Sequence, residues 1–236
     1  MNKIKTALVL VILVATGITC VKPIYSEQMF LQHIGTLLLL IPLVYDAIKN
    51  RMPMSAFVAM TLFALLHVVG ARWIYSYVPY REWSISLGVP ADYWGVPAGF
   101  QGDVTAFFKE HCKVLRNHYD RLIHFSFGFL LFPYLVHKCR RWVEGKPMIA
   151  IVMAWLLVQV GSMIYEIFEW QLSVWSEQGD AYNGQQGDIW DAQKDMLLAM
   201  IGSTVMVVLY VIKSKYWNTM GPNPHSISKG DCRCRR

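Results

Sequence analysis

Ionisable side chains gather where one apolar stretch of this chain begins. Residues 117–125 read NHYDRLIHF and merge into the run FSFGFLLFPYLV, which is suited to cross a bilayer. An ionisable side chain at the bilayer centre costs about 2.5–3.5 kcal/mol on insertion scales. Asp120, Arg121 and His124 therefore lie near the interface, pair with one another, or serve a function.

Three other apolar stretches also carry ionisable residues toward one end. The ionisable residues are His67 and Arg72 in residues 54–78, Glu166 and Glu169 in the motif YEIFEW, and Asp188, Asp191 and Asp195 in the motif DIWDAQKDM. Spacings of three and four residues place each acidic set on one helix face. Since carboxylates avoid lipid, we expect these faces to turn toward one another in the outer half of the membrane.

The charges of such a cluster do not balance. Six carboxylates face three fixed cations and two histidines; the cations are Arg72, Arg121 and Lys194. Either some carboxyl groups hold a proton, because burial and like charge both oppose ionisation, or a divalent cation resides there. Carboxylates and imidazole without thiolate suit Mg²⁺, Mn²⁺, Fe²⁺ or Zn²⁺.

A membrane enzyme that acts on a lipid or lipid-linked envelope substrate would divide these residues by role. His124 and Glu169 would act as general acid or base. The metal or the substrate would be held by Asp120, Glu166, Asp191 and Asp195. Substrate binding would use Arg72, Arg121 and His67, with the two arginines on phosphate.

Each residue also has a purely structural interpretation. Asp120, Asp188 and Asp191 can complement the positive end of a helix dipole. Glu166 and Glu169 can mark a helix end that reaches for water, and His67 can be a hydrogen-bonded core histidine. Arg72 can extend to the headgroups. These interpretations do not explain why four helices converge.

The elements that must position these residues are membrane helices. The chain has 236 residues, of which 55% are hydrophobic and only 16% charged, with a mean hydropathy of +0.33. Soluble domains carry about 25% charged residues. Stretches near the spanning length of about 20 residues occur at residues 4–21, 29–47, 54–78, 121–137, 148–172 and 194–212. We therefore predict an all-α, polytopic bundle of six transmembrane helices.

The net charge of +6 predicts topology and not nucleic-acid binding. Basic residues fall in alternate connections, beginning with Lys3 and Lys5 and ending in the C-terminal tail. By the positive-inside rule these segments are cytoplasmic, so both termini are predicted on the cytoplasmic side of the membrane. The long connection at 79–119 also carries basic residues, but long loops weigh less in this rule.

One membrane domain is predicted over residues 1–215, followed by a basic cytoplasmic tail at 216–236. The first apolar stretch resembles a secretory signal, but no small-x-small cleavage site follows, so we expect an uncleaved helix. The aromatic-rich loop 79–119 is expected to form a lid on the outer leaflet. Cys232 and Cys234 form a weak metal signal, and Cys20 and Cys112 both fall toward the outer side, where they can in principle pair.

Four segments carry a resemblance to a known family: LHVVGARWIYSYVPY, NHYDRLIHFSFGFLL, YEIFEW and DIWDAQKDMLLAMIGS. Over essentially its whole length the chain resembles the YjdF-like inner-membrane proteins, a bacterial family of unknown function. The resemblance implies a cell-envelope context, but it does not indicate a reaction.

From residue 120 onward the sequence is also similar to the VanZ-like membrane proteins, which include a glycopeptide-antibiotic resistance member. Their first element, Asp-Lys-x-x-His-Phe, is matched here by Asp120, His124 and Phe125, with Arg121 in place of Lys. Glu166 matches the start of their Glu-x-x-Gln element.

The remaining VanZ-like element, Asp-x-x-x-Asn-x-x-Gly-x-x-x-Gly, begins here at Asp191 and keeps its second glycine as Gly202. Leu198 stands in the place of the first glycine. Asp195 replaces the Asn, as Glu169 replaces the Gln of the preceding element. These added carboxylates argue against an antibiotic-related role.

Three functions fit these observations. The first is the metal-dependent enzyme described above, and the second is a non-catalytic envelope protein that binds a ligand, cation or partner in the same pocket. The third is an ion or proton transporter, which needs polar groups that continue to the inner side. The inner halves of the stretches offer little for it, since Asp46 and Gln159 look isolated.

Overall fold

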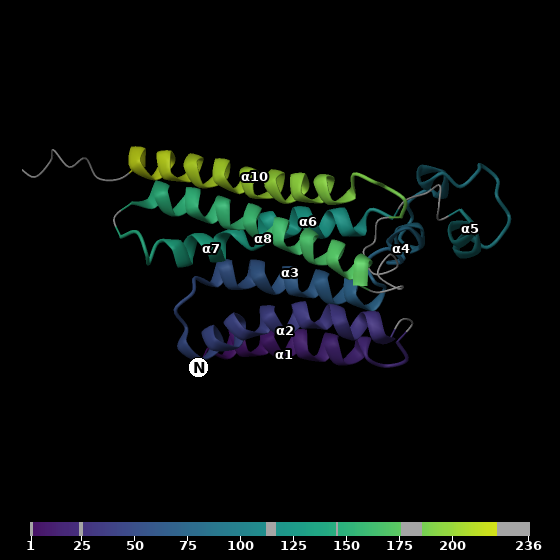
Figure 1. Ribbon diagram of the computed structural model, residues 1–236, viewed down its shortest axis with the longest axis horizontal. Helices are drawn as coiled ribbons and strands as arrows, with labels where there is room; N and C mark the ends of the chain where they lie inside the picture. Colours follow the sequence, from purple (N-terminus) through teal and green to yellow (C-terminus); the bar gives the residue numbers. More distant parts are fainter. Residues whose placement is uncertain (1, 24–25, 112–116, 145, 176–185, 221–236) are drawn as a thin grey trace, which may run out of the picture.

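The computed structural model describes residues 2–23, 26–111, 117–144, 146–175 and 186–220, apart from the side chains of 27, 109 and 214–220. All regular structure in these residues is helical, without a strand. The long helices run side by side in a bundle (Figure 1). The predicted all-α fold is thereby confirmed.

The helices follow the predicted apolar stretches closely. Their bounds are α1 Lys3–Thr19, α2 Ser26–Lys49, α3 Met54–Arg72, α4 Tyr80–Ser86, the 3₁₀ helix η1 Ala91–Trp94, α5 Val104–Glu110, α6 Tyr119–Leu130, α7 Phe132–Cys139, α8 Pro147–Trp175 and α10 Asp191–Met220. α10 thus continues five residues past the predicted domain end at 215.

Five helical stretches in the described part of the chain are long and apolar enough to cross a membrane: α2, α3, α6 with α7, α8 and α10. α1 has 17 residues, at the lower limit of the roughly 17–25 that span a bilayer. It lies alongside α2 and α3 and packs against both (Figure 1). The count of six spans and the orientation with both termini inside stay predictions.

The helices alternate in direction. α1, α3 and α8 begin at the end of the bundle marked N, where α2, α7 and α10 end (Figure 1). We call this the basic end, because the connections rich in Lys and Arg lie there. The opposite end carries α4, η1 and α5 and is called the α4–α5 end.

A buried ion pair closes the basic end. Lys5 Nζ lies 2.6 Å from Asp46 Oδ2 and donates to the carbonyl oxygen of Met52 at 2.6 Å. Asp46 Oδ1 accepts from the backbone N–H groups of Arg51 and Met52. The expectation that Asp46 is isolated is therefore wrong, because its partner Lys5 lies on the neighbouring helix α1, 41 positions earlier in the sequence.

α6 and α10 approach each other more closely than side chains allow. A Cβ on Gly128 would overlap the carbonyl oxygen of Ala199, and one on Gly202 would overlap that of Phe125. Small residues let membrane helices pack backbone to backbone. The small-residue face around Ala199, Gly202 and Ser203 is thus a helix contact, and Gly128 is its partner.

Two helix ends differ from the sequence expectation. α3 ends at Arg72 and not near residue 78, because Ile74 and Tyr75 adopt left-handed backbone angles with φ of 41° and 55°. The stretch 121–137 is divided between α6 and α7 at Leu131. Pro133, which lacks an N–H group, explains this break.

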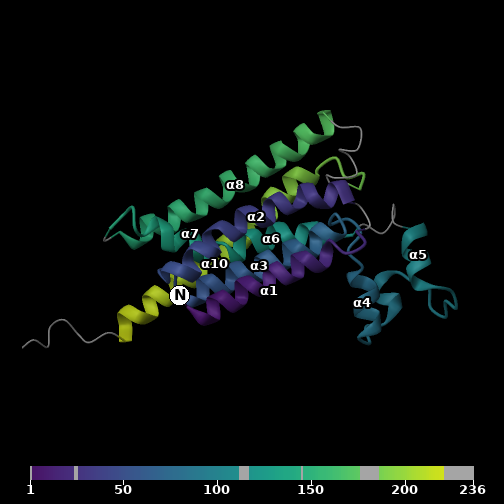
Figure 2. The same ribbon diagram turned by 90° about the horizontal axis from the view of Figure 1, so that it is seen from below.

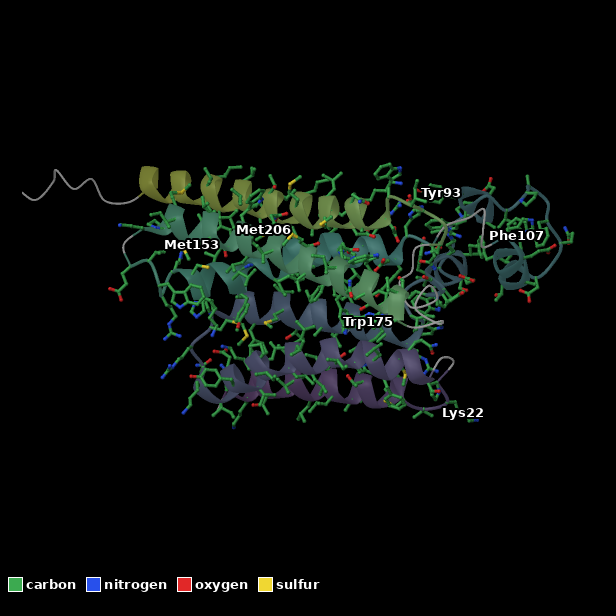
Figure 3. The ribbon with its side chains drawn as sticks, viewed as in Figure 1. Lys22, Tyr93, Phe107, Met153, Trp175 and Met206 are labelled. Carbon is green, nitrogen blue, oxygen red and sulfur yellow. The ribbon has the colours of Figure 1, made fainter. Side chains whose placement is uncertain are left out.

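The outer connection folds beyond the bundle. Both views place α4 and α5 past the end of the long helices (Figures 1 and 2), with Tyr93 and Phe107 in this segment (Figure 3). The Arg81 guanidinium is buried there over the rings of Tyr80, Trp94 and Phe108, at 5.5–5.9 Å from each centroid. Contact of this segment with the outer leaflet stays a prediction.

Several expectations fall outside the described residues. They concern Cys112 and its pairing with Cys20, most of the loop 173–188, and the tail beyond 220 with Cys232 and Cys234. Within the bundle, Met206 packs against the core between α7, α8 and α10, near Met153 (Figure 3).

Candidate functional site

The acidic cluster begins on α6. Asp120 and His124 are one helical turn apart and both are buried. His124 Nε2 lies 3.8 Å from Asp120 Oδ1 and 3.3 Å from Glu166 Oε1 of α8. One imidazole nitrogen thus faces carboxylates from two helices.

α10 is the third helix, after α6 and α8, that contributes residues to the cluster. Ligand atoms of Asp120, His124 and Asp195 all lie within 4.8 Å of one another. Asp195 also hydrogen-bonds to Asp191, one turn earlier in α10. The structure thus brings Asp120, His124, Glu166 and Asp195 together, whereas their functional roles and their place in the outer half of the membrane stay predictions.

The close crossing of α6 and α10 explains this convergence. Gly128 lies one turn below His124 on α6, and Gly202 lies two turns below Asp195 on α10. Because both glycines are at the backbone contact, the acidic residues on the same helix faces are forced together. Of these two, only Gly202 could be singled out from the sequence.

Two buried carboxylate oxygens in the cluster lack a hydrogen bond. Glu166 Oε1 and Asp195 Oδ1 have no hydrogen-bond partner among the described residues. His124 Nε2 is close to Glu166 Oε1, but the geometry is not that of a hydrogen bond. Buried carboxylates normally accept hydrogen bonds or ligate a cation, so these atoms point to a missing ligand or proton.

Glu169 lies one turn beyond Glu166 and is also buried. Its carboxylate accepts a hydrogen bond from the Tyr165 hydroxyl. The Tyr165 ring in turn packs against the His124 ring, with 5.7 Å between centroids. Tyr165 was not recognised from the sequence, where a tyrosine in an apolar helix gives no distinct signal.

Asp188 belongs to an ion-pair group at the rim of the cluster. Its Oδ2 lies 2.6 Å from both Arg121 Nη2 and Lys194 Nζ, and its Oδ1 accepts from the N–H of Trp190. Arg121 Nη2 is also 3.9 Å from Asp191 Oδ1. α10 begins at Asp191, so Asp188 precedes the helix and does not start it as expected. Arg121 thus lies beside the cluster, already paired.

Arg72 is not brought to the cluster. Its Nη1 donates to the carbonyl oxygens of Thr19 at 2.6 Å and Val21 at 3.3 Å. Thr19 is the last residue of α1 and Val21 follows the helix. Backbone carbonyls at a helix C-terminus have no partner within the helix. The guanidinium therefore ties α3 to the end of α1, a contact that only the tertiary structure reveals. Its predicted role in phosphate binding has no support from this position.

An apolar cavity of about 300 Å³ adjoins the cluster. Of the predicted site residues it touches Asp120, His124 and His67. Its other walls are mostly apolar; they include Leu38, Leu39, Phe63, Ile123, Phe127 and Leu131. Glu166, Glu169, Asp191 and Asp195 do not line it, because they face the α6–α10 contact.

His67 stands on the side of the cavity formed by α3. Its Nε2 faces the carbonyl oxygen of Gln32 at 3.1 Å, and its Nδ1 is hydrogen-bonded to the Tyr75 hydroxyl. Because a carbonyl can only accept, Nε2 carries the proton and Nδ1 accepts from Tyr75. Both ring nitrogens are engaged, so direct binding of a substrate by either one requires that a bond breaks.

Two glycines and the strained turn after α3 make room for this pair. A Cβ on Gly35 would lie 2.9 Å from the His67 ring, and a Cβ on Gly70 would lie 2.7 Å from Cδ1 of the Tyr75 ring. The left-handed angles of Ile74 and Tyr75 fold the chain back over α3. Such backbone conformations are costly for non-glycine residues and persist where packing fixes them.

Gln159 is also less isolated than expected. Its Nε2 donates to the hydroxyl oxygen of Ser203 at 3.1 Å and to the carbonyl oxygen of Trp155 at 3.0 Å. Trp155 in turn donates its indole N–H to the hydroxyl of Thr204. These bonds join α8 to α10 on the side of the cluster toward the basic end.

The donor set of the cluster fits a divalent cation. Two ligand atoms held at 2.0–2.2 Å from one ion are at most about 4.4 Å apart. The distances of 3.3 Å and 3.8 Å around His124 Nε2 lie within this limit. The ligand atoms of Asp120, His124 and Asp195 lie within 4.8 Å of one another. Only a small side-chain movement is therefore needed to bring all three atoms within reach of one ion. The group with mutually close ligand atoms is Asp120, His124 and Asp195, and Glu166 joins it only through its 3.3 Å approach to His124. Carboxylates and imidazole favour a hard or borderline metal.

Comparisons with known proteins agree with this membrane architecture. The family described as "Predicted membrane protein (DUF2238)" matches residues 4–215. The chain is 28% identical over 204 residues to the "Inner membrane protein YjdF" of Escherichia coli (strain K12), covering 84% of this chain and 82% of that protein. No solved structure matches. The similarity to VanZ-like proteins stays a prediction.

The family match extends from the first turn of α1 into the last part of α10, so it includes every helix that contributes to the acidic cluster and the cavity. The chain belongs to the DUF2238 family of membrane proteins.

Proposed function

We propose that this chain is an inner-membrane protein that binds a divalent cation in its acidic cluster and uses it on a lipid or lipid-linked envelope substrate. The inner-membrane location is supported by the family, which is one of membrane proteins, and by the E. coli relative, which is an inner-membrane protein. The α4–α5 end then faces the periplasm, in line with the basic residues at the other end.

One observation carries the proposal. Glu166 Oε1 and Asp195 Oδ1 are buried without a hydrogen bond among the described residues. Glu166 Oε1 lies 3.3 Å from His124 Nε2, and Asp195 offers a ligand atom within 4.8 Å of one on His124. A bound cation would satisfy both atoms and offset the repulsion within the cluster. It would thereby remove the main cost of burying so many carboxylates between membrane helices.

The roles in this proposal differ from those expected from the sequence, because Asp191 is not among the ligands and neither Arg72 nor His67 is given a substrate role. His124 lies among the carboxylates and is a ligand in this proposal, whereas the sequence suggested a general acid or base. Glu169 keeps the acid–base role, since it lies one turn from Glu166 and bonds to Tyr165. Arg121 is the cation placed to meet a phosphate at the rim.

A bound divalent cation would polarise a phosphoryl or carbonyl oxygen of the substrate. The adjoining apolar cavity suits the hydrocarbon part of a lipid. A transporter is less well supported, because the polar pairs toward the basic end are closed by their own contacts. These pairs are Lys5 with Asp46 and Gln159 with Ser203.

Elemental analysis of the purified protein tests the metal site. The wild type is expected to retain about one divalent cation per chain through purification, and Asp195→Asn is expected to lose it. Asp188→Asn is the matched control, because Asp188 is an acidic residue of the same region that is engaged by Arg121 and Lys194. Absence of metal from the wild type after incubation with Mn²⁺, Zn²⁺, Fe²⁺ or Mg²⁺ would refute the proposal.

The enzymatic part is tested separately. Wild-type protein and Asp195→Asn are incubated with a total envelope-lipid extract, and the products are compared by mass spectrometry. A lipid consumed only by the metal-loaded wild type supports catalysis. A protein that binds metal but leaves every lipid unchanged would favour the non-catalytic binding function.

A further inference from the structure

The apolar cavity has a floor and an open side. Phe63 on α3 and Ile123 on α6 line it and are buried, with 6% and 7% of their surfaces exposed. Leu38 on α2 also lines it but is 63% exposed. Gly161 and Tyr165 of α8 are partly exposed. The open side of the cavity therefore lies between α2 and α8.

α2 and α8 do not close this gap. α2 packs against α1 and α3, whereas α8 packs against α7, α10 and α6. Gly35 on α2 and Gly161 on α8 both line the cavity. A Cβ on Gly161 would lie 3.1 Å from the Phe127 ring, so even a small side chain there would narrow the opening.

The mouth lies at the depth of the hydrocarbon core. Gly161 is midway between the ends of α8 at Pro147 and Trp175, about 21 Å of helix from each at a rise of about 1.5 Å per residue. Leu38 is likewise near the middle of α2. A bilayer core is about 30 Å thick, so what meets the mouth in a membrane is acyl chain and not water.

We propose that the cavity binds one hydrocarbon chain of a membrane lipid, which enters sideways from the bilayer between α2 and α8. The chain would pack on Phe63 and Ile123. Asp120 and His124, which line the cavity and also belong to the acidic cluster, would then face the polar part of the same molecule. The role of this lipid as substrate rests on the proposed function, whereas its binding does not.

Photolabelling tests the proposal directly. The full-length protein is placed in nanodiscs of phosphatidylethanolamine and phosphatidylglycerol that contain a phosphatidylethanolamine with a diazirine on its acyl chain. Labelled residues are mapped by mass spectrometry. Bulk lipid cannot reach the buried floor, so labelling of Ile123 requires a chain inside the cavity. Val158 of α8 is fully buried away from the cavity and gives the background.

Two variants narrow the mouth from opposite sides, Leu38→Trp from α2 and Gly161→Leu from α8. Both are expected to reduce labelling of Ile123 at least fivefold. Leu37→Trp is the matched control: Leu37 is 62% exposed on the same helix but does not line the cavity. Its labelling pattern at Ile123 is expected to stay within twofold of the wild type.

Labelling of Ile123 no stronger than that of Val158 in the wild type would overturn the proposal, as would equal effects of Leu38→Trp and Leu37→Trp. The metal content of the same wild-type preparation separates the two proposals. Labelled Ile123 in a protein without metal contradicts the cation site alone, and a stoichiometric metal with unlabelled Ile123 contradicts only lipid entry.

Discussion

A single methyl group at Gly202 is predicted to disturb the acidic cluster from two helical turns away. In Gly202→Ala the new Cβ would overlap the carbonyl oxygen of Phe125 and lie 3.0 Å from the backbone nitrogen of Phe129. Ordinary contacts begin near 3.4 Å. Neither neighbour is a movable side chain, so α6 and α10 must separate by about 1 Å in a close-packed bundle.

This separation is expected to weaken metal binding as well as the fold. Overpacking of this kind costs about 1–3 kcal/mol of stability. Metal sites, however, tolerate ligand displacements of only about 0.2 Å. The ligands Asp120 and His124 move with α6, whereas Asp195 moves with α10. We expect a loss of metal affinity of about 10–100-fold, as for changes that misorient ligands without removing them.

Metal affinity is measured by competition with a fluorescent chelator in detergent, and stability by intrinsic fluorescence during thermal unfolding. Gly17→Ala is the control, because a Cβ at Gly17 meets nothing within 4 Å. This control should bind metal like the wild type. If Gly202→Ala keeps wild-type affinity while its unfolding temperature falls, the α6–α10 contact does not position the ligands and the reasoning is refuted.

Three further predictions concern other parts of the bundle. Lys5→Met leaves the buried Asp46 carboxylate without its cation and should lower stability by about 3–5 kcal/mol, whereas the double variant Lys5→Met/Asp46→Leu should recover part of this loss in thermal unfolding. Tyr75→Phe removes the hydrogen bond to His67 and should cost about 1–3 kcal/mol in the same assay; no change would mean that the bond contributes nothing. Metal affinity should fall as the pH is lowered, because His124 and the carboxylates bind metal only when deprotonated; a pH-independent affinity would exclude them as ligands.

The acidic cluster was predictable from the sequence because two simple regularities combine in it. Spacings of three and four residues put Asp120 with His124 and Asp191 with Asp195 on single helix faces. Alternating helix directions then bring those faces to the same end of the bundle. Lipid offers no solvation for carboxylates, so only inward-facing arrangements are stable. Local sequence therefore constrains this part of the tertiary structure.

The partners of isolated polar residues were not predictable in this way. Asp46 pairs with Lys5 across 41 positions of sequence, and Arg72 reaches carbonyls at the end of α1. The contact between Gly128 on α6 and helix α10 depends on how the two helices are aligned along their axes. The sequence of either helix alone does not determine this alignment. The turn at Ile74 was missed for another reason, since a β-branched residue gives no signal for a left-handed backbone.

The cavity and the acidic cluster meet at a seam between two halves of the bundle. α1, α2 and α3 share one apolar core, and α7, α8 and α10 share another. α6 lies between them and presents Asp120 and His124 to both the cluster and the cavity. Sites between the helices of a bundle are common places for ligands to bind.

This division places the proposed metal ligands and part of the proposed lipid-binding surface on different helices. The proposed ligands come from α6, α8 and α10, whereas the α2 side of the lipid-facing mouth, which includes Leu38, carries none of them. A substitution on α2 can therefore change which hydrocarbon chain fits without moving a metal ligand. Conversely, loss of Asp195 removes the proposed cation but leaves the apolar walls intact. The two proposals can thus be tested on one protein with substitutions that do not overlap.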